Sequence, residues 1–306
     1  MPSKAVLITG NGFDLNLGLK TKYSDFAKSD EWKEMYDKGT AKSQYYSLLK
    51  YLNDRKQLDN WFDIEQALFE YAHIKTKNVW YHDVKTDKRE YIILCETLSL
   101  YLRNHINSQS GNLSNTFAAK MLGCFQYNSE RRKIYTLNYT PLDLIIRVIP
   151  LMHPVPFTHI HGSIKEQNII VGFETNHLES IIPDYSFLLK SNNPSYQHTQ
   201  MHQDMIDADE VIIFGHSLNM IDAVLFEDYF RDLTIRSDTN RRLTIITKDE
   251  SSRQTILMNI RNMGISVPKL YSHANLEFLL TELCDEKEKY EKHVAPLLKR
   301  IEIFGV

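Results

Sequence analysis

The fold is decided by VLITGNGFDLNLGLKT, residues 6–21. A short apolar run ends at Thr9, and Gly10, Gly12 and Gly18 follow it. This pattern is typical of a buried parallel strand that enters a tight turn before a helix. Glycine lets the backbone approach a phosphate closely, and the first N–H groups of the helix attract negative charge. The segment therefore predicts a nucleotide-phosphate site, and the alternative is a tight turn that holds no ligand.

The spacing of the three glycines bears on the reaction. It is G-x-G-x-x-x-x-x-G, whereas ordinary Rossmann dehydrogenases carry G-x-G-x-x-G. The spacing therefore counts against hydride transfer between a nicotinamide cofactor and a substrate.

Composition and charge exclude several classes of protein. Of 306 residues, 42% are hydrophobic and 25% are charged, which is ordinary globular usage. The formal net charge of -3 gives no basic excess with which to hold a nucleic acid. The first apolar run is far shorter than the roughly 20 residues of a membrane span. The three cysteines are Cys95, Cys124 and Cys284. They lie too far apart in the sequence for a disulfide framework or a cysteine zinc site, which fits a reducing cytoplasm.

Short apolar runs return after residue 130 and alternate with helical patterns. That alternation favours a parallel sheet with crossover helices, so we predict an α/β fold with a Rossmann-like parallel sheet. Further strands are expected at Lys133–Leu137, Phe157–Ile160, Ile169–Val171, Val211–Phe214 and Leu243–Thr247.

Helical periodicity dominates from about Asp30 to Phe125, and we interpret this span as a helical insertion. The expected domains are a Rossmann-like core over residues 1–29 and 126–284, the insertion over 30–125, and a C-terminal helical tail over 285–306. Two apolar helix faces lie in the insertion: Ile64, Leu68, Tyr71 and Ala72, and Leu94, Leu98, Leu102 and Ile106.

Three helix signals lie outside the insertion. A helix is expected to begin with Thr140 as its N-cap and Pro141 at its first position, followed by the apolar run Leu142–Ile149. Another helix is expected to end near Gly264. The charged tail is expected to form a surface helix that Pro296 starts or kinks.

Three further motifs follow or end predicted strands. They are TLNYTPLD at 136–143, HIHGS at 159–163 and IIFGHSLNMID at 212–222. Ligand groups gather at the carboxyl ends of parallel strands. We therefore expect these motifs and the glycine turn to converge on one crevice.

This ordered set resembles the sirtuin-like NAD-binding superfamily, in which a glycine turn, a T-x-N, an H-G and a G-x-S segment line the NAD pocket. More narrowly, the chain resembles the abortive-infection AbiH family of phage-defence proteins. That resemblance covers most of residues 5–230 and rests on GNGFDLNLGLKTKYSDF at 10–26, WFDIEQ at 61–66 and GHSLNMID at 215–222.

The resemblance implies NAD as ligand or substrate and gives roles to individual residues. Asn138 matches the sirtuin asparagine that orients the nicotinamide ribose and a reactive water, and His161 matches the histidine that serves as base. Asp14 stands where sirtuins usually have serine, which places a carboxylate near the phosphates, the ribose or a cation. The residues expected to contact or shape the dinucleotide site are Gly10, Asn11, Gly12, Asp14, Gly18, Thr136, Gly215, His216, Ser217 and Asp222.

Each of these assignments has a structural alternative. His161 could bond only a carbonyl group, and Asn138 could only cap the helix that follows it. His159 faces the other side of an extended segment from His161, which favours a structural or rim position. His216 could point toward the ligand or away from it. Asp222 could favour a helix dipole or contact a ribose.

Two pairs lie outside these motifs. Trp61 and Glu65 share a helix face, and the simpler interpretation is a packed Trp61 beside a solvated Glu65. The alternative has Glu65 reaching over the pocket as a second carboxylate. His198 and His202 have helical spacing for a metal but no matched carboxylate, so no metal is expected. The resemblance to sirtuins does not extend to their cysteine zinc module, which argues against lysine deacylation.

The leading hypothesis is a cytoplasmic anti-phage abortive-infection effector, an NAD glycohydrolase that cleaves the nicotinamide–ribose bond. Cleavage builds positive charge on the ribose while nicotinamide leaves neutral, so the enzyme must position the sugar and supply a nucleophile. Asparagine and histidine can do this.

The alternatives are a nucleotide-binding sensor or regulatory subunit without turnover, and a nuclease that uses Asp14, Glu65 and nearby histidines. No membrane or nucleic-acid partner is expected. The sequence leaves open whether NAD or NADP is preferred, what the trigger is, and whether the chain forms a homo-oligomer or has a defence-system partner protein.

Overall fold

The computed structural model contains two compact units. The sheet unit consists of Met1–Leu19, Ser110–Ile160 and Gln197–Val306, and the helical unit consists of Lys20–Gln109 and His161–Tyr196. The described residues are 4–40, 46–58, 63–77, 83–107, 116–125, 131–145, 155–174, 181–196, 199–236, 241–285, 288 and 290–303.

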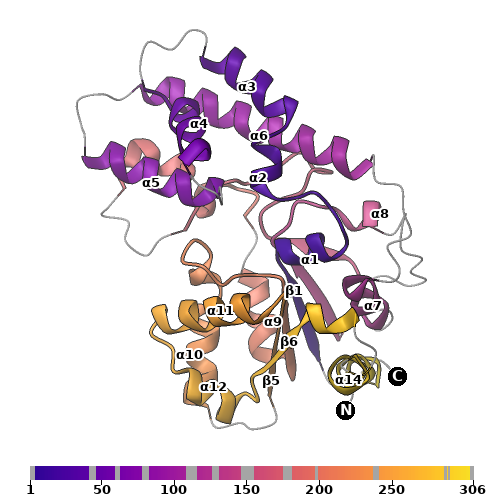
Figure 1. Ribbon diagram of the computed structural model, residues 1–306. Helices are drawn as coiled ribbons and strands as arrows, with labels where there is room; N and C mark the ends of the chain where they lie inside the picture. Colours follow the sequence, from indigo (N-terminus) through magenta and orange to yellow (C-terminus); the bar gives the residue numbers. More distant parts are fainter. Residues whose placement is uncertain are drawn as a thin grey trace. The chain divides into compact units, whose positions relative to one another are not determined.

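The described part of the sheet unit contains one six-stranded parallel sheet. Its strands are β1 (Ala5–Thr9), β2 (Arg132–Thr136), β3 (Phe157–His159), β4 (Glu210–Phe214), β5 (Arg242–Thr247) and β6 (Glu277–Leu280). Their order is β3-β2-β1-β4-β5-β6, and Figure 1 labels β1, β5 and β6. Doubly wound dinucleotide-binding folds have this order, in which the direction of strand addition reverses between β1 and β4. The prediction of an α/β fold with a parallel sheet is confirmed, and the order is compatible with a Rossmann-like fold.

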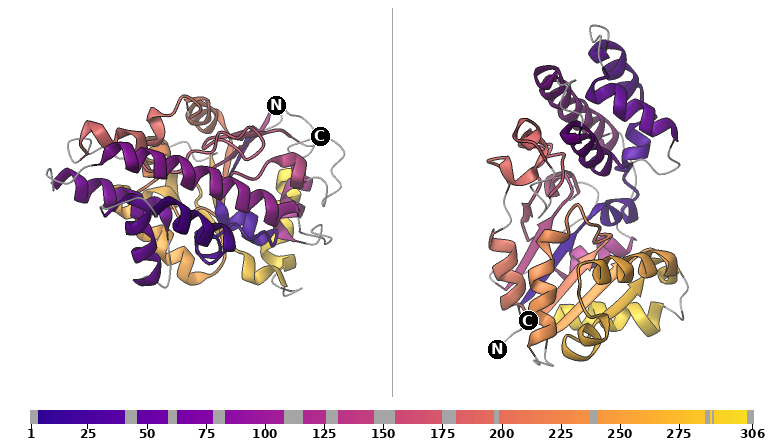
Figure 2. Two further views of the ribbon diagram at one scale, coloured as in Figure 1. Left: turned by 90° about the horizontal axis from the view of Figure 1, so that it is seen from above. Right: turned by 90° about the vertical axis from the view of Figure 1, so that its left-hand side faces the viewer.

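The described helices of the sheet unit are α1 (Asn11–Asn16), α7 (Phe117–Cys124), α8 (Leu142–Ile145), α9 (Thr199–Asp207), α10 (Glu227–Ile235), α11 (Glu250–Asn262), α12 (Val267–His273) and α14 (Ala295–Ile303), with short turns η5 (Ala223–Leu225), η6 (Thr281–Asp285) and η7 (Tyr290–Val294). α7 and α14 lie on one side of the sheet and α9 and α10 on the other (Figure 1, Figure 2). Because both faces are covered, β1 and β4 are buried along their whole length. Leu7 of β1, Ile134 of β2 and Ile212 of β4 share one core with Phe13 and Met121 from the helices.

The predicted strands are confirmed to within one residue at each end, except one. The prediction of a strand at Ile169–Val171 is wrong. This segment belongs to the helical unit, where the N–H of Ile170 donates to the carbonyl of His161 at 2.8 Å and no ladder forms. A short apolar run can be buried in a strand or in an irregular segment, so its pattern alone cannot distinguish between them. Strand β6 was not predicted because only Leu279 in it is fully buried.

The helix predictions are confirmed in part. α11 ends at Asn262 before Gly264, which has a φ of 74°. α8 begins at Leu142, one residue after the expected first position, Pro141, and residues 146–149 lie outside the described residues. Thr140 was expected as the N-cap, and its hydroxyl donates to Asp14. The tail is helical with Pro296 as the second residue of α14, but Leu297 is buried in the sheet core, so this helix is not only a surface helix.

The helical unit contains α2 (Tyr23–Phe26), α3 (Asp30–Thr40), α4 (Leu48–Leu58), α5 (Ile64–Lys77), α6 (Val84–Asn107), η3 (Pro183–Leu188) and η4 (Lys190–Asn192). The side chains of both predicted apolar faces, on α5 and α6, are buried. The unit's bounds differ from those of the expected insertion. α7 joins the sheet unit because Phe117 and Met121 enter its core. Residues 161–196 join the helical unit, where the Tyr91 hydroxyl donates to the carbonyl of Val171 at 2.7 Å.

A buried carboxylate on α6 joins four elements of the helical unit. One oxygen of Asp87 accepts from the N–H of Leu48 at 3.0 Å and from the Tyr71 hydroxyl at 2.8 Å. The other oxygen accepts from the Tyr185 hydroxyl at 2.5 Å. Leu48 begins α4, Tyr71 lies on α5 and Tyr185 on η3. Asp87, which is 1% exposed, therefore caps one helix and orients two tyrosine hydroxyls.

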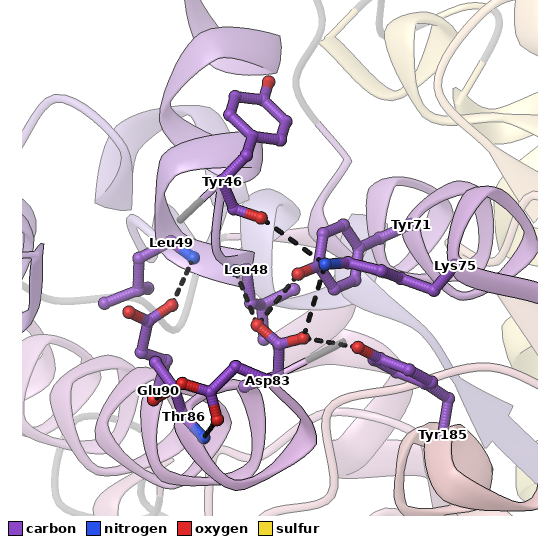
Figure 3. A network of polar contacts seen from close by, with 10 residues as sticks. Tyr46, Leu48, Leu49, Tyr71, Lys75, Asp83, Thr86, Glu90 and Tyr185 are labelled. Carbon is purple, nitrogen blue, oxygen red and sulfur yellow. Dashed lines mark hydrogen bonds and ion pairs between the residues drawn. The ribbon is translucent and has the colours of Figure 1, made fainter. Parts of the chain in front are cut away.

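A second carboxylate completes the cap. Glu90, one turn further along α6, accepts from the N–H of Leu49 at 2.8 Å (Figure 3). Burial raises the pKa of the Glu90 carboxyl above its ordinary value. In Figure 3 the side chains of Lys75 and Tyr185 point toward one shared carboxylate of this network. The Lys75 ammonium lies 3.8 Å from the carboxylate of Asp87. Asp87 and Glu90 are thus part of the core of this unit.

Substitution of Asp87 by alanine is expected to lower the free energy of unfolding by about 3 kcal/mol or more, because buried donors lose their acceptor. Asp83→Ala is the matched control. Asp83 is exposed and directly precedes α6, and its side chain accepts from the N–H and the hydroxyl of Thr86, so its loss is expected to cost about 1 kcal/mol. Urea denaturation followed by circular dichroism measures both, and equal losses would contradict this account.

Candidate functional site

The candidate site lies at the carboxyl edge of the sheet unit, defined here as Gly10–Asp14, Leu137–Thr140 and Gly215–Asp222. These segments directly follow β1, β2 and β4. In doubly wound sheets, ligands bind at this edge where the strand order reverses, which is between β1 and β4.

The glycine turn after β1 touches the loop after β4 backbone to backbone. The N–H of Gly12 donates to the carbonyl of Gly215 at 2.8 Å. A Cβ on Gly12 would lie 2.7 Å from the Gly215 Cα, and one on Gly215, whose φ is 70°, would lie 2.3 Å from the Phe13 nitrogen. A Cβ on Gly10 would lie 2.8 Å from the His216 Cβ. These glycines are therefore required by close packing of the two loops.

The same contacts use N–H groups that were expected near phosphates. Gly10 donates to Phe214, Gly12 to Gly215, and Phe13 to the carbonyl of Gly10. The glycines shape this edge, and these three N–H groups already have acceptors within the sheet unit.

Gly18 has a conformational role at the other end of α1. Its φ is 84°, and its N–H donates to the carbonyl of Leu15 at 2.9 Å. The N–H of Leu19 donates to the carbonyl of Asp14 at 2.9 Å. Together these two bonds form a Schellman motif, which ends the helix on a left-handed glycine.

Asp14 connects the glycine turn to the segment after β2. Its side chain is 1% exposed. Oδ1 accepts from the Asn138 Nδ2 at 2.8 Å, and Oδ2 accepts from the Thr140 hydroxyl at 2.6 Å. The Asn138 Nδ2 also donates to the carbonyl of Gly10 at 2.9 Å. Thr140 was expected only as a helix cap, so its part in this cluster was missed.

Burial raises the pKa of the Asp14 carboxyl from an ordinary value of 3.8 to about 7, against the opposing effect of the hydrogen bonds from Thr140 and Asn138. Neither donor carries a charge that would offset the loss of hydration. The carboxyl group is therefore close to half protonated near neutral pH. This makes Asp14 a proton-binding group inside the candidate site.

The loop after β4 is held by its own histidine. The N–H of Leu218 donates to the His216 Nδ1 at 3.0 Å, so this nitrogen carries no proton. The His216 Nε2 lies 3.3 Å from an oxygen of Asp222 and donates to it. Leu218 has a φ of 53°, an uncommon conformation for leucine. His216 thus fixes a strained loop, and the side chains of His216 and Asp222 are both buried.

The remaining expected site residues of the sheet unit lie around these clusters. The Thr136 hydroxyl accepts from the N–H of Asn138 at 3.1 Å. Ser217 and Asn11 are exposed. The carbonyl of Ser217 accepts from the Asn259 Nδ2 at 2.9 Å, which ties the β4 loop to α11.

The two histidines of HIHGS fall in different units. His159, the last residue of β3, belongs to the sheet unit, and its Nδ1 lies 3.0 Å from the carbonyl of Asn138 and donates to it. His161 begins the second part of the helical unit, is 2% exposed and stacks on Tyr196 with ring centres 6.0 Å apart. Within the sheet unit, the structure therefore brings together three of the four motifs and the first two residues of the fourth.

The pairs outside the motifs have other roles. Glu65 is not a solvated side chain: it lies 3.0 Å from the ammonium of Lys190, whose side chain is 0% exposed. Trp61 and His198 lie outside the described residues. Among the residues that the structure describes, no group of three or more histidine, cysteine, aspartate or glutamate side chains could hold a metal ion.

The fold and this edge define a class: an α/β protein with an open parallel sheet in doubly wound order. In the part of the chain that the structure describes, no helix is long and apolar enough to cross a membrane. The sequence model of the family described as bacteriophage abortive infection AbiH matches residues 6–246. The chain therefore belongs to the AbiH family, whose description suggests a role in phage abortive infection. A comparison with curated proteins finds no match.

The raised pKa of Asp14 predicts how stability varies with pH. The folded state holds this proton up to about pH 7, whereas the unfolded chain releases it near 3.8. The free energy of unfolding should therefore fall by a few kcal/mol as the pH rises through this window. Asp14→Asn cannot ionise, so it should gain stability relative to the native protein between about pH 5 and pH 8.5. Urea denaturation of both proteins at these two pH values tests this, and a constant difference would contradict it.

Proposed function

We propose that this AbiH-family chain binds a nucleotide of the NAD type at the carboxyl edge of its sheet unit and hydrolyses the nicotinamide–ribose bond. Support for binding comes from the strand order, which reverses where the glycine turn and the β4 loop meet. The sequence resemblance to sirtuin-like proteins supplies the ligand class.

The observation that carries the reaction is the state of the Asn138 amide. Its nitrogen donates to Gly10 and Asp14, whereas among the described residues its oxygen, Oδ1, accepts no hydrogen bond. An amide oxygen at a strand end can orient a ribose hydroxyl or a water molecule. Asn138 keeps 8% exposure at this edge.

The reaction breaks the bond between ribose C1′ and the nicotinamide nitrogen. The electron pair goes to nicotinamide, which leaves neutral, and positive charge develops on the ribose. The oxygen of a water molecule bonds to C1′ while a base takes one of its protons. The sequence resemblance assigns the role of base to His161, and the products are nicotinamide, ADP-ribose and that proton.

A second function is favoured by a specific observation. Several polar groups of the carboxyl edge hold the loops to one another, including the N–H groups of Gly10 and Gly12 and the Asn138 Nδ2. An edge fixed in this way also suits a nucleotide sensor that binds without turnover.

Incubation of the purified protein with NAD, with nicotinamide and ADP-ribose separated by chromatography, tests the reaction. His161→Ala is expected to lower the rate by about 100- to 10,000-fold, the usual effect of removing a general base. His202→Ala, on α9, is the matched control and should keep the native rate. His159→Ala shows whether the neighbouring histidine serves instead.

Three results would change the proposal. An unchanged rate in His161→Ala would overturn its role as base. Binding of ADP-ribose in calorimetry with no release of nicotinamide would overturn the hydrolase in favour of the sensor. Absence of both binding and release would overturn the nucleotide site itself.

A further inference from the structure

The orientation of the Asn138 amide is fixed by its neighbours. The carbonyl of Gly10 can only accept a hydrogen bond, so the group that lies 2.9 Å from it must be the amide nitrogen. The second hydrogen of that nitrogen is taken by Asp14 Oδ1 at 2.8 Å. With both hydrogens engaged on one side, the amide oxygen is turned to the other side.

Asp14 is not placed to contact a ligand itself. Its side chain is 1% exposed, and both of its oxygens accept hydrogen bonds from protein groups. This differs from the expectation that its carboxylate lies against the phosphates, the ribose or a cation. Whatever Asp14 does at the carboxyl edge, it must do through Asn138 or Thr140.

Either protonation state of Asp14 keeps Asn138 in place. When the carboxyl is ionised, Oδ1 accepts from Asn138 and Oδ2 from Thr140. When it is protonated, the proton can lie on Oδ2 and be donated to the Thr140 hydroxyl, while Oδ1 still accepts from Asn138. An asparagine at position 14 reproduces the second arrangement, with its oxygen toward Asn138 and its NH₂ group toward Thr140.

We propose that Asp14 is a positioning residue that fixes the Asn138 amide, so that Oδ1 of Asn138 faces the reacting ribose or its water. This inference rests on the proposed function for its catalytic consequence. The orientation of the amide is a property of the protein alone.

Three variants separate positioning from general stability. Asp14→Ala removes the acceptor for Asn138. Asp14→Asn restores that acceptor without the charge. Thr140→Val is the matched structural control, because it removes the other hydrogen bond to the same carboxyl group and leaves the bond to Asn138.

The first measurement is steady-state NAD hydrolysis. Asp14→Ala is expected to lower kcat by about 100-fold, the size of effect that a misplaced group produces, while KM for NAD stays close to the native value. Asp14→Asn should restore most of the kcat that Asp14→Ala loses. Loss of kcat in Asp14→Asn equal to that in Asp14→Ala would overturn the proposal.

The second measurement does not depend on turnover. Nitrogen-15 NMR of the Asn138 side-chain amide should show hydrogens that exchange slowly with solvent in the native protein, Asp14→Asn and Thr140→Val, and rapidly in Asp14→Ala. Equal exchange in all four proteins would overturn the positioning role. If the native protein released no nicotinamide, the proposed function would fail while this readout still decided the orientation of Asn138.

Discussion

The hydrogen bond from the N–H of Gly12 to the carbonyl of Gly215 is the contact on which the candidate site depends. It joins the two loops that leave β1 and β4, the strands between which the sheet reverses its order. The contact requires glycine on both sides, since a Cβ at either position would overlap backbone atoms of the other loop. Once these loops touch, the starting positions of α1 and of the His216 loop are both fixed. The close backbone approach that glycine permits thus serves a contact between these two loops of the protein.

Two buried aspartates organise the two units in different ways. Asp87 gathers a helix start and two tyrosine hydroxyls within the helical unit, with Lys75 near enough to balance its charge. Asp14 receives only neutral donors, Asn138 and Thr140, within the sheet unit. Removal from water is therefore the largest influence on the pKa of Asp14 and raises it to about 7. The folded state is therefore most stable when the Asp14 carboxyl group is protonated.

The sequence predicts the sheet well because each central strand is a continuous apolar run that closes on turn residues. Ala5–Thr9 and Val211–Phe214 are of this kind. The position of Asn138 at a strand end followed from the same pattern. Its partner did not, because Asp14 lies 124 residues away and neither residue type indicates a pair. The nearby donor Thr140 drew attention only as a helix cap.

The predicted domain bounds show a second limit of sequence patterns. Periodicity identified the helices of residues 30–125, but it cannot show that α7 packs on the sheet or that residues 161–196 pack with the helices. Those assignments depend on which apolar faces meet. The same limit applies to HIHGS, whose two histidines were expected on opposite sides of one strand and fall on opposite sides of a unit boundary.

Hydrogen–deuterium exchange with and without saturating ADP-ribose tests most directly whether the carboxyl edge is a nucleotide site. Binding there should slow the exchange of backbone amides in residues 10–14, 137–140 and 215–222, because a bound ligand suppresses local opening of the loops it contacts. The exchange of α10 and α12 should stay unchanged. Unaltered exchange in all three segments, or protection confined to other parts of the chain, would contradict this account.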